Sequence, residues 1–261
     1  MKRLLGKIAI LFMTSAVAAI GEDEAFAEKK FTGDKGGELL YRWLTPARID
    51  SAQRYPLVIF LHGAGERGND NLAQLKHCVR KFAEPDIRKA YPSYVIAPQC
   101  PSGKVWVDVD WRAVTHVTPK QPSESMGLVL ELVDSVMTKH PVDASRVYVI
   151  GLSMGGYGTW DIMVRRPDMV AAAVPICGGA DDSQAARIAH IPVWVWHGDS
   201  DGAVKTLRSR NIVKALKAAG GAPIYSELQG VGHDSWTPAF KDEKLFPWLF
   251  KQRRREASNL P

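Results

Sequence analysis

The sequence predicts an α/β protein built on one mainly parallel sheet flanked by helices. Apolar, β-branched runs of strand length alternate with segments whose apolar residues recur at helical spacing. Several of these runs pass directly into glycine-rich loops, which is typical of strands buried on both faces of an open sheet. No linker or internal repeat separates the units, so the 261 residues are expected to form one large domain behind a targeting segment.

The individual elements follow from this alternation. Expected strands cover residues 36–44, 55–61, 94–97, 147–150, 169–176, 191–196 and 224–228, the first of them at a sheet edge. Expected helices cover residues 69–90, 124–139, 183–189, 212–219 and 241–251. The helix at 124–139 is the clearest, because Met126, Val129, Leu130 and Val133 fall on one face.

The N-terminus has the pattern of a secretory signal peptide. Basic residues precede an apolar run from Ile8 to Ile20, which is too short to span a bilayer in the usual way. Ala25-Phe26-Ala27 offers small residues at both positions that a signal peptidase reads, and Ala16-Val17-Ala18 is the alternative. We expect cleavage after Ala27, a domain over residues 28–261, and a soluble secreted or periplasmic protein without a stable membrane anchor.

Charge and cysteine content add little to this prediction. Part of the net charge of +6 is a basic run at residues 251–255, which is usually a solvated tail, so no nucleic-acid partner is expected. The chain contains 3 cysteines, Cys78, Cys100 and Cys177. Either Cys78 pairs with Cys100, or all of them are small buried side chains.

The most informative stretch is residues 147–160. A buried strand runs into Gly151-Leu152-Ser153-Met154-Gly155, which fits the G-x-S-x-G pattern of a strained strand-to-helix turn. Such a turn exposes the hydroxyl of Ser153 and directs the first helical amides toward it. The competing interpretation is a tight turn whose serine only caps a helix.

Partners for a nucleophilic serine follow later in the chain. One expected strand ends at His197-Gly198-Asp199-Ser200-Asp201, and the last expected strand leads to Gly232-His233. Their order after Ser153 is acid and then histidine, as in the α/β-hydrolase arrangement. An imidazole is needed to take the serine proton, and a carboxylate is needed to orient the imidazole.

With these motifs, and with the segments at residues 61–68 and 98–101, the chain resembles the α/β-hydrolase superfamily. It is similar to bacterial secreted carboxylesterases, also described as predicted peptidases, that are related to dienelactone-hydrolase and feruloyl-esterase-like proteins. The resemblance covers nearly all of the mature chain. It implies Ser153 as nucleophile, His233 as base and Asp201 as acid, with Asp199 as the competitor that is more often a loop-capping carboxylate.

The expected oxyanion hole would use the amides of Met154 and Ala64. Trp236 is expected to bind substrate, because it lies three residues beyond His233. Glu66 and Arg67 are expected to form an ion pair that braces the loop. His62 and His197 are expected to bond loop backbones, and His77 to occupy a surface or helix position. No cofactor and no metal are expected, because the histidine spacing fits no zinc site.

The predicted function is a serine carboxylesterase that acts on a small-molecule ester through an acyl-enzyme. A small-peptide hydrolase is the catalytic alternative. A glycan-binding protein on a hydrolase scaffold is the alternative of another class, because fold alone does not fix function. The sequence predicts neither the acyl and alcohol groups of the substrate nor the oligomeric state.

Overall fold

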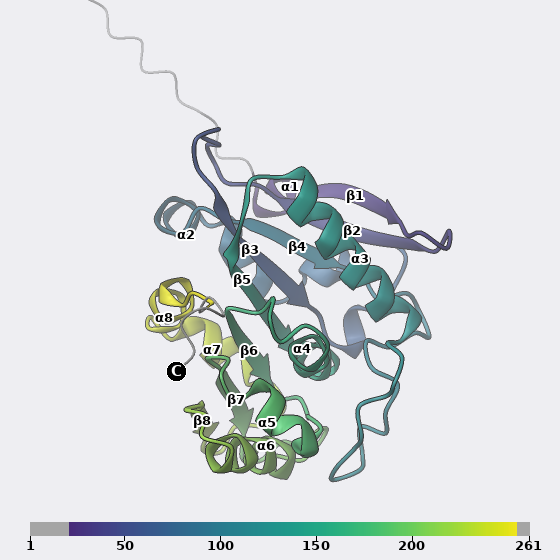
Figure 1. Ribbon diagram of the computed structural model, residues 1–261, viewed down its shortest axis with the longest axis vertical. Helices are drawn as coiled ribbons and strands as arrows, with labels where there is room; N and C mark the ends of the chain where they lie inside the picture. Colours follow the sequence, from purple (N-terminus) through teal and green to yellow (C-terminus); the bar gives the residue numbers. More distant parts are fainter. Residues whose placement is uncertain (1–20, 255–261) are drawn as a thin grey trace, which may run out of the picture.

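A computed structural model describes residues 21–254. The sheet has 8 strands in the order β1-β2-β4-β3-β5-β6-β7-β8 (Figure 1). The pairings from β4 through β8 are parallel, and β1 and β2 pair antiparallel at one edge. The predicted mainly parallel sheet is therefore confirmed.

The strands are β1 (Ala27–Thr32), β2 (Glu38–Leu44), β3 (Tyr55–Leu61), β4 (Tyr94–Pro98), β5 (Val142–Leu152), β6 (Ala172–Ile176), β7 (Trp194–Gly198) and β8 (Ile224–Leu228). The α-helices are α1 (Glu22–Ala25), α2 (Pro85–Ala90), α3 (Glu124–Lys139), α4 (Met154–Arg165), α5 (Ala185–Ile188), α6 (Leu207–Ala218), α7 (Trp236–Lys241) and α8 (Leu245–Lys251). Short 3₁₀ helices are η1 (Ala64–Glu66), η2 (Ala73–Leu75), η3 (Cys78–Ala83) and η4 (Asp182–Gln184).

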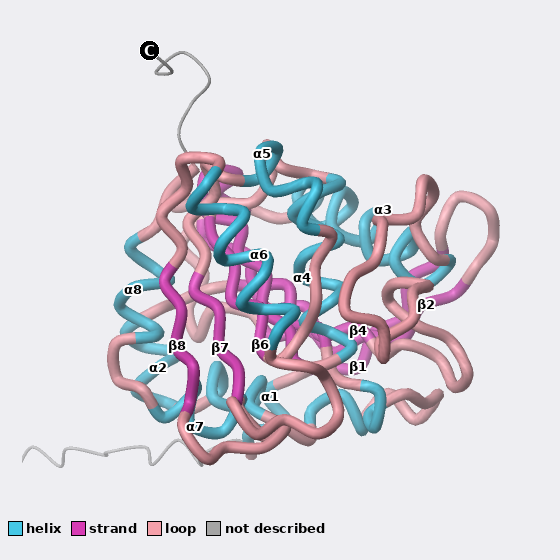
Figure 2. Tube along the Cα trace, turned by 90° about the horizontal axis from the view of Figure 1, so that it is seen from below, coloured by secondary structure: helices cyan, strands magenta, loops and turns pink. Residues whose placement is uncertain are grey.

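Helices cover both faces of the sheet (Figures 1 and 2). One apolar layer joins α3, α4, α5 and α6 to the sheet, and the other joins η3, α7 and α8 to it. Alternate residues of β3 supply the two layers, since Ile59 and Leu61 face the first and Val58 and Phe60 face the second. This two-sided burial explains why β3 is apolar throughout.

Most predicted elements occur at the predicted places, and the differences have local causes. The helix expected at residues 69–90 was wrong, because Asn71 adopts a left-handed φ of 51° and Pro85 starts a new helix, α2. The strand expected at 191–196 begins later, at Trp194, since Pro192 has no N–H for a ladder. The helix expected at 241–251 begins only at Leu245, as α8, and Lys241 instead ends α7, a helix that was not predicted.

The expected signal-peptidase site after Ala27 stays a prediction. The predicted apolar targeting run, Ile8 to Ile20, lies outside the described residues. Residues 22–27, expected to be removed with it, form α1 and the start of β1, and Phe26 is 0% exposed. At this end of the sheet, β1 is the edge strand, and the strand predicted there, β2, lies next to it.

Two further predictions concern bonds and membranes. Cys78, Cys100 and Cys177 are free thiols, so the structure has the unpaired alternative. Over residues 21–254, no helix combines the length and the apolar character that a membrane span requires.

Candidate active site

The predicted nucleophile lies on a sharp turn between β5 and α4. Ser153 has φ 55° and ψ −118°, a strained conformation for a residue with a side chain. A Cβ on Gly151 would overlap the carbonyl of Gly155, and a Cβ on Gly155 would overlap the carbonyl of Leu61. Both glycines are therefore required for β5, α4 and β3 to approach this closely.

The predicted base and acid converge on Ser153. His233 Nε2 lies 2.9 Å from Ser153 Oγ, and His233 Nδ1 lies 2.7 Å from Asp201 Oδ2. The loops after β5, β7 and β8 supply these residues, because parallel strands end at the same edge of the sheet. Ser153, His233 and Asp201 thus form one continuous chain of hydrogen bonds.

The carboxylate of Asp201 is fully buried and heavily hydrogen-bonded. It accepts hydrogen bonds from the amides of Ala203, at 2.8 Å, and Val204, at 2.9 Å. Burial alone would raise the pKa of Asp201. The hydrogen bonds from His197, His233 and these amides outweigh burial and hold the pKa well below its ordinary value.

Asp199, the competing acid, has a different role. Its Oδ1 accepts hydrogen bonds from the Ser200 hydroxyl and from the amide of Gly230, at 2.8 Å each. Asp199 therefore ties the turn after β7 to the loop after β8, as a loop carboxylate does.

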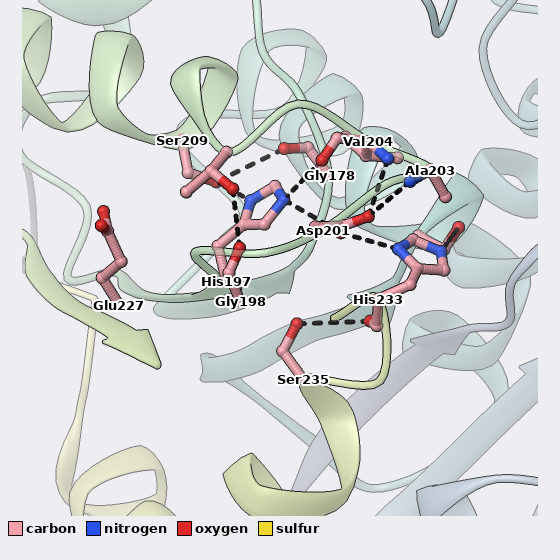
Figure 3. Close-up of polar contacts among 12 residues, drawn as sticks. Gly178, His197, Gly198, Asp201, Ala203, Val204, Ser209, Glu227, His233 and Ser235 are labelled. Atoms are coloured by element: carbon pink, nitrogen blue, oxygen red, sulfur yellow. Dashed lines mark hydrogen bonds and ion pairs between the residues drawn. The ribbon is translucent and has the colours of Figure 1, made fainter. Parts of the chain in front are cut away.

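A second imidazole, that of His197, contacts the predicted acid, although only bonds to loop backbone were expected of it. Figure 3 shows Asp201 between His197 and His233. His197 Nε2 lies 3.2 Å from Asp201 Oδ2 and 3.0 Å from the carbonyl of Val204, and its Nδ1 lies 2.7 Å from the Ser209 hydroxyl. The predicted backbone bond is present, and the contact with Asp201 was missed. The sequence carried a signal for this contact, because His197 and Asp201 lie four residues apart in one turn.

The predicted ion pair between Glu66 and Arg67 was wrong. Glu66 is buried and pairs with His77, whose Nε2 lies 3.2 Å from its Oε1. Arg67 instead donates to the carbonyls of Ala64 and Lys104. Burial raises the pKa of Glu66, but the hydrogen bond and charge of His77 more than offset this and leave the pKa below its usual value.

Trp236 packs against the predicted base. Its ring stands perpendicular to that of His233, with centroids 5.4 Å apart, and His77 lies on it at 5.2 Å. The ring of Trp236 therefore restricts the orientation of His233. Since Trp236 is only partly buried, one part of it also remains open to a ligand.

The two amides expected to form an oxyanion hole each open a helix near Ser153. Met154 opens α4 and Ala64 opens η1, and the first amides of a helix have no acceptor within it. Among the described residues, neither amide donates a backbone hydrogen bond outside its own element. A Cβ on Gly63 would lie 3.5 Å from the Cβ of Ser153, so this loop adjoins the serine.

A group of potential metal ligands overlaps the same residues. Among the described residues, Cys177, Asp201 and His233 bring their ligand atoms within 4.8 Å of one another. The arrangement fits a metal poorly, because burial raises the pKa of the Cys177 thiol and disfavours the thiolate that a metal requires. Asp201 and His233 are also already bonded to each other.

The sheet order, the helices on both faces and the site at the carboxyl edge define an α/β-hydrolase. The chain belongs to the Phospholipase/Carboxylesterase family, whose sequence model matches residues 48–246.

Individual relatives agree with this family. A thermostable esterase of known structure has 36% sequence identity and a TM-score of 0.83, covering 89% of this chain and 64% of that chain. Poly(3-hydroxyalkanoate) depolymerase C of Paucimonas lemoignei is 27% identical over 173 residues, which are 65% of this chain and 39% of the depolymerase. A probable carboxylesterase of Oryza sativa is 24% identical over 229 residues, 81% of this chain and 94% of that protein.

The chain spans less than two thirds of both the depolymerase and the esterase structure.

Proposed function

We propose that this protein is a serine carboxylesterase that hydrolyses small-molecule esters through an acyl-enzyme on Ser153. The observation that carries the proposal is the unbroken chain from Asp201 through His233 to Ser153 on a strained turn. A serine that only capped a helix would not need an imidazole at 2.9 Å from its hydroxyl.

Each residue has a distinct role in the proposed reaction. His233 Nε2 accepts the proton of Ser153 as its Oγ attacks the ester carbonyl, and Asp201 stabilises the resulting imidazolium. The amides of Met154 and Ala64 stabilise the negative charge on the carbonyl oxygen. His233 then protonates the departing alkoxide, and water releases the acid by the same route in reverse.

The substrate is proposed to be an ester of modest size. The depolymerase and the esterase are both longer than this chain, so their full activities do not transfer to it. We propose that the exposed part of Trp236 contacts the substrate, because its ring flanks the base that must reach the leaving group. Replacing it with leucine would then raise KM more than it lowers kcat.

The triad is tested by hydrolysis of p-nitrophenyl acetate and butyrate. Ser153→Ala and Asp201→Asn should each lower kcat by roughly 10³-fold or more. Asp199→Asn is the matched control and should leave kcat unchanged, since Asp199 only joins two loops. A fluorophosphonate probe should label Ser153 and no residue in Ser153→Ala. Equal turnover by the wild type and Ser153→Ala would refute the proposal.

We also propose that the chain is exported through its N-terminal segment. Basic residues followed by the apolar run from Ile8 to Ile20 support this, as they form the pattern that the export machinery recognises.

A further inference from the structure

The residues just after the apolar N-terminal run are built into the folded domain. Phe26 is 0% exposed and belongs to the same apolar layer as Val79 and Phe82 of η3. Burying a phenylalanine to this extent contributes about 2 kcal/mol or more. Phe26 is therefore a core residue.

The acidic residues before Phe26 are also engaged. Asp23 accepts two hydrogen bonds from the Arg80 guanidinium, from Nε at 2.5 Å and from Nη2 at 2.9 Å. This bidentate geometry fixes α1 against η3. Asp23, one of the acidic residues at 22–24, therefore helps to hold α1 on the rest of the protein.

Arg42 of β2 depends on the same segment. Its side chain is only 9% exposed, and it donates to the Phe26 carbonyl at 2.9 Å, to Glu28 at 2.7 Å and to the Asn71 carbonyl at 2.5 Å. A buried guanidinium is stable only when its donors are satisfied. The Phe26 carbonyl is one of the acceptors that satisfy it.

These contacts continue to the loop beside the catalytic serine. The Asn71 side chain donates to the Lys29 carbonyl at 3.3 Å, and the Asn71 amide donates to Gln99 Oε1 at 2.7 Å. Gln99 Nε2 in turn donates to the Glu66 carbonyl at 3.3 Å. A buried polar network therefore joins the N-terminal segment to η1, the 3₁₀ helix that starts at Ala64.

We propose that the signal-peptidase site is Ala16-Val17-Ala18, with cleavage after Ala18, and that the exported protein therefore keeps residues 21–27 as part of its folded domain. Cleavage after Ala27 would remove Phe26 from the core, take the Phe26 carbonyl away from Arg42 and take Asp23 away from Arg80. The upstream site lies near the end of the apolar run from Ile8 to Ile20 and has no acidic residues before it. This inference rests on the proposed export of the chain.

The first test is the intact mass of the exported protein. The full-length chain, with a C-terminal tag, is expressed in a host that secretes through signal peptides, and the exported product is measured by mass spectrometry. We expect a chain that begins at Ala19. The exported Ala27→Gln variant should be heavier than the exported wild type by the mass difference between glutamine and alanine. A product that begins at Glu28, or one that still carries residues 1–18, would overturn the proposed site. Ester hydrolysis by the same sample reports independently on the proposed activity.

The second test uses a residue whose effect depends on its retention. Phe26→Ala in the full-length chain should lower the Tm of the exported protein by roughly 10 °C, because it leaves a cavity in the core. Glu24→Ala, on the same segment but exposed, is the matched control and should leave the Tm unchanged. An identical Tm for Phe26→Ala and the wild type would show that residue 26 is absent from the mature domain, which contradicts the proposal.

Discussion

His197 and His233 meet the same carboxylate oxygen, Asp201 Oδ2, at 3.2 Å and 2.7 Å. His197 is fully buried and cannot reach solvent, so its contact serves to hold the carboxylate in place.

We expect His197→Leu to lower kcat for p-nitrophenyl butyrate about tenfold or more while KM stays nearly constant, because the proposed acid loses a partner and substrate contacts are intact. His197→Gln retains a donor near the position of Nε2 and should recover most of the loss. The measurement is steady-state kinetics on all three proteins. A parallel change in kcat and KM, or equal losses in both variants, would indicate a general structural defect.

Arg42 should contribute far more to stability than an exposed arginine. Arg42→Met leaves the carbonyls of Phe26 and Asn71 without their buried donor, and we expect a loss of about 2–4 kcal/mol in the free energy of unfolding. Arg210→Ala breaks an ion pair with Glu227 on the surface and should cost far less stability. Urea unfolding of both variants measures the difference, and similar losses would contradict the role of Arg42.

Gly155 should tolerate no side chain. Gly155→Ala would force a Cβ into the carbonyl of Leu61 and separate α4 from β3, so we expect an inactive and poorly folded protein. Gly127 of α3 is the matched control, because the nearest atom to a Cβ there is 4.0 Å away. Gly127→Ala should stabilise the protein by about 0.5–1 kcal/mol, since alanine favours a helix. Active Gly155→Ala would contradict the close packing at this turn.

Acid should weaken the fold through His62. Burial lowers the pKa of His62 to about 4. Its Nε2 accepts the amide of Cys100 at 2.9 Å, while Nδ1 lies 2.6 Å from the Gly63 carbonyl, so the ring is bonded in its neutral form. The unfolded chain has the ordinary value and takes up the proton first as the pH falls.

The neutral His62 ring therefore makes its full contribution to the free energy of unfolding above about pH 6.5. This contribution is lost as the pH falls from 6.5 to about 4. We expect a decrease on the order of 3 kcal/mol across this interval from His62. His116, whose pKa burial and Arg208 also lower to about 4, should add to the decrease. Urea unfolding between pH 4 and pH 7.5 measures it. A slope as steep in His62→Gln as in the wild type would rule out His62 as a source.

Local patterns in the sequence were enough for much of the fold. The helix at Glu124–Lys139 and the strands at Tyr55–Leu61 and Ile224–Leu228 have the predicted bounds, because their periodicity is strong and their ends carry clear signals. The segment at residues 69–90 was harder to predict. Its apolar spacing favours a helix, but tertiary contacts hold Asn71 in a left-handed conformation.

The pairing of charged and polar side chains was least predictable. Glu66 has Arg67 beside it in sequence and yet pairs with His77, which η2 and the following turn bring to it. The N-terminal strand was missed for a related reason, since residues 22–32 show a targeting context locally and acquire their place only through Arg42 and Arg80.

By itself, the sequence determined the α/β alternation, the strained turn at Ser153 and the order of serine, acid and histidine along the chain. These features are local, because glycine positions and residue periodicity constrain the backbone within a few residues. Only the tertiary structure decided which groups surround Asp201, which side chain pairs with Glu66 and how residues 22–27 pack. Those outcomes depend on contacts between residues tens of positions apart, and their geometry exists only once the sheet and its two helical layers have assembled.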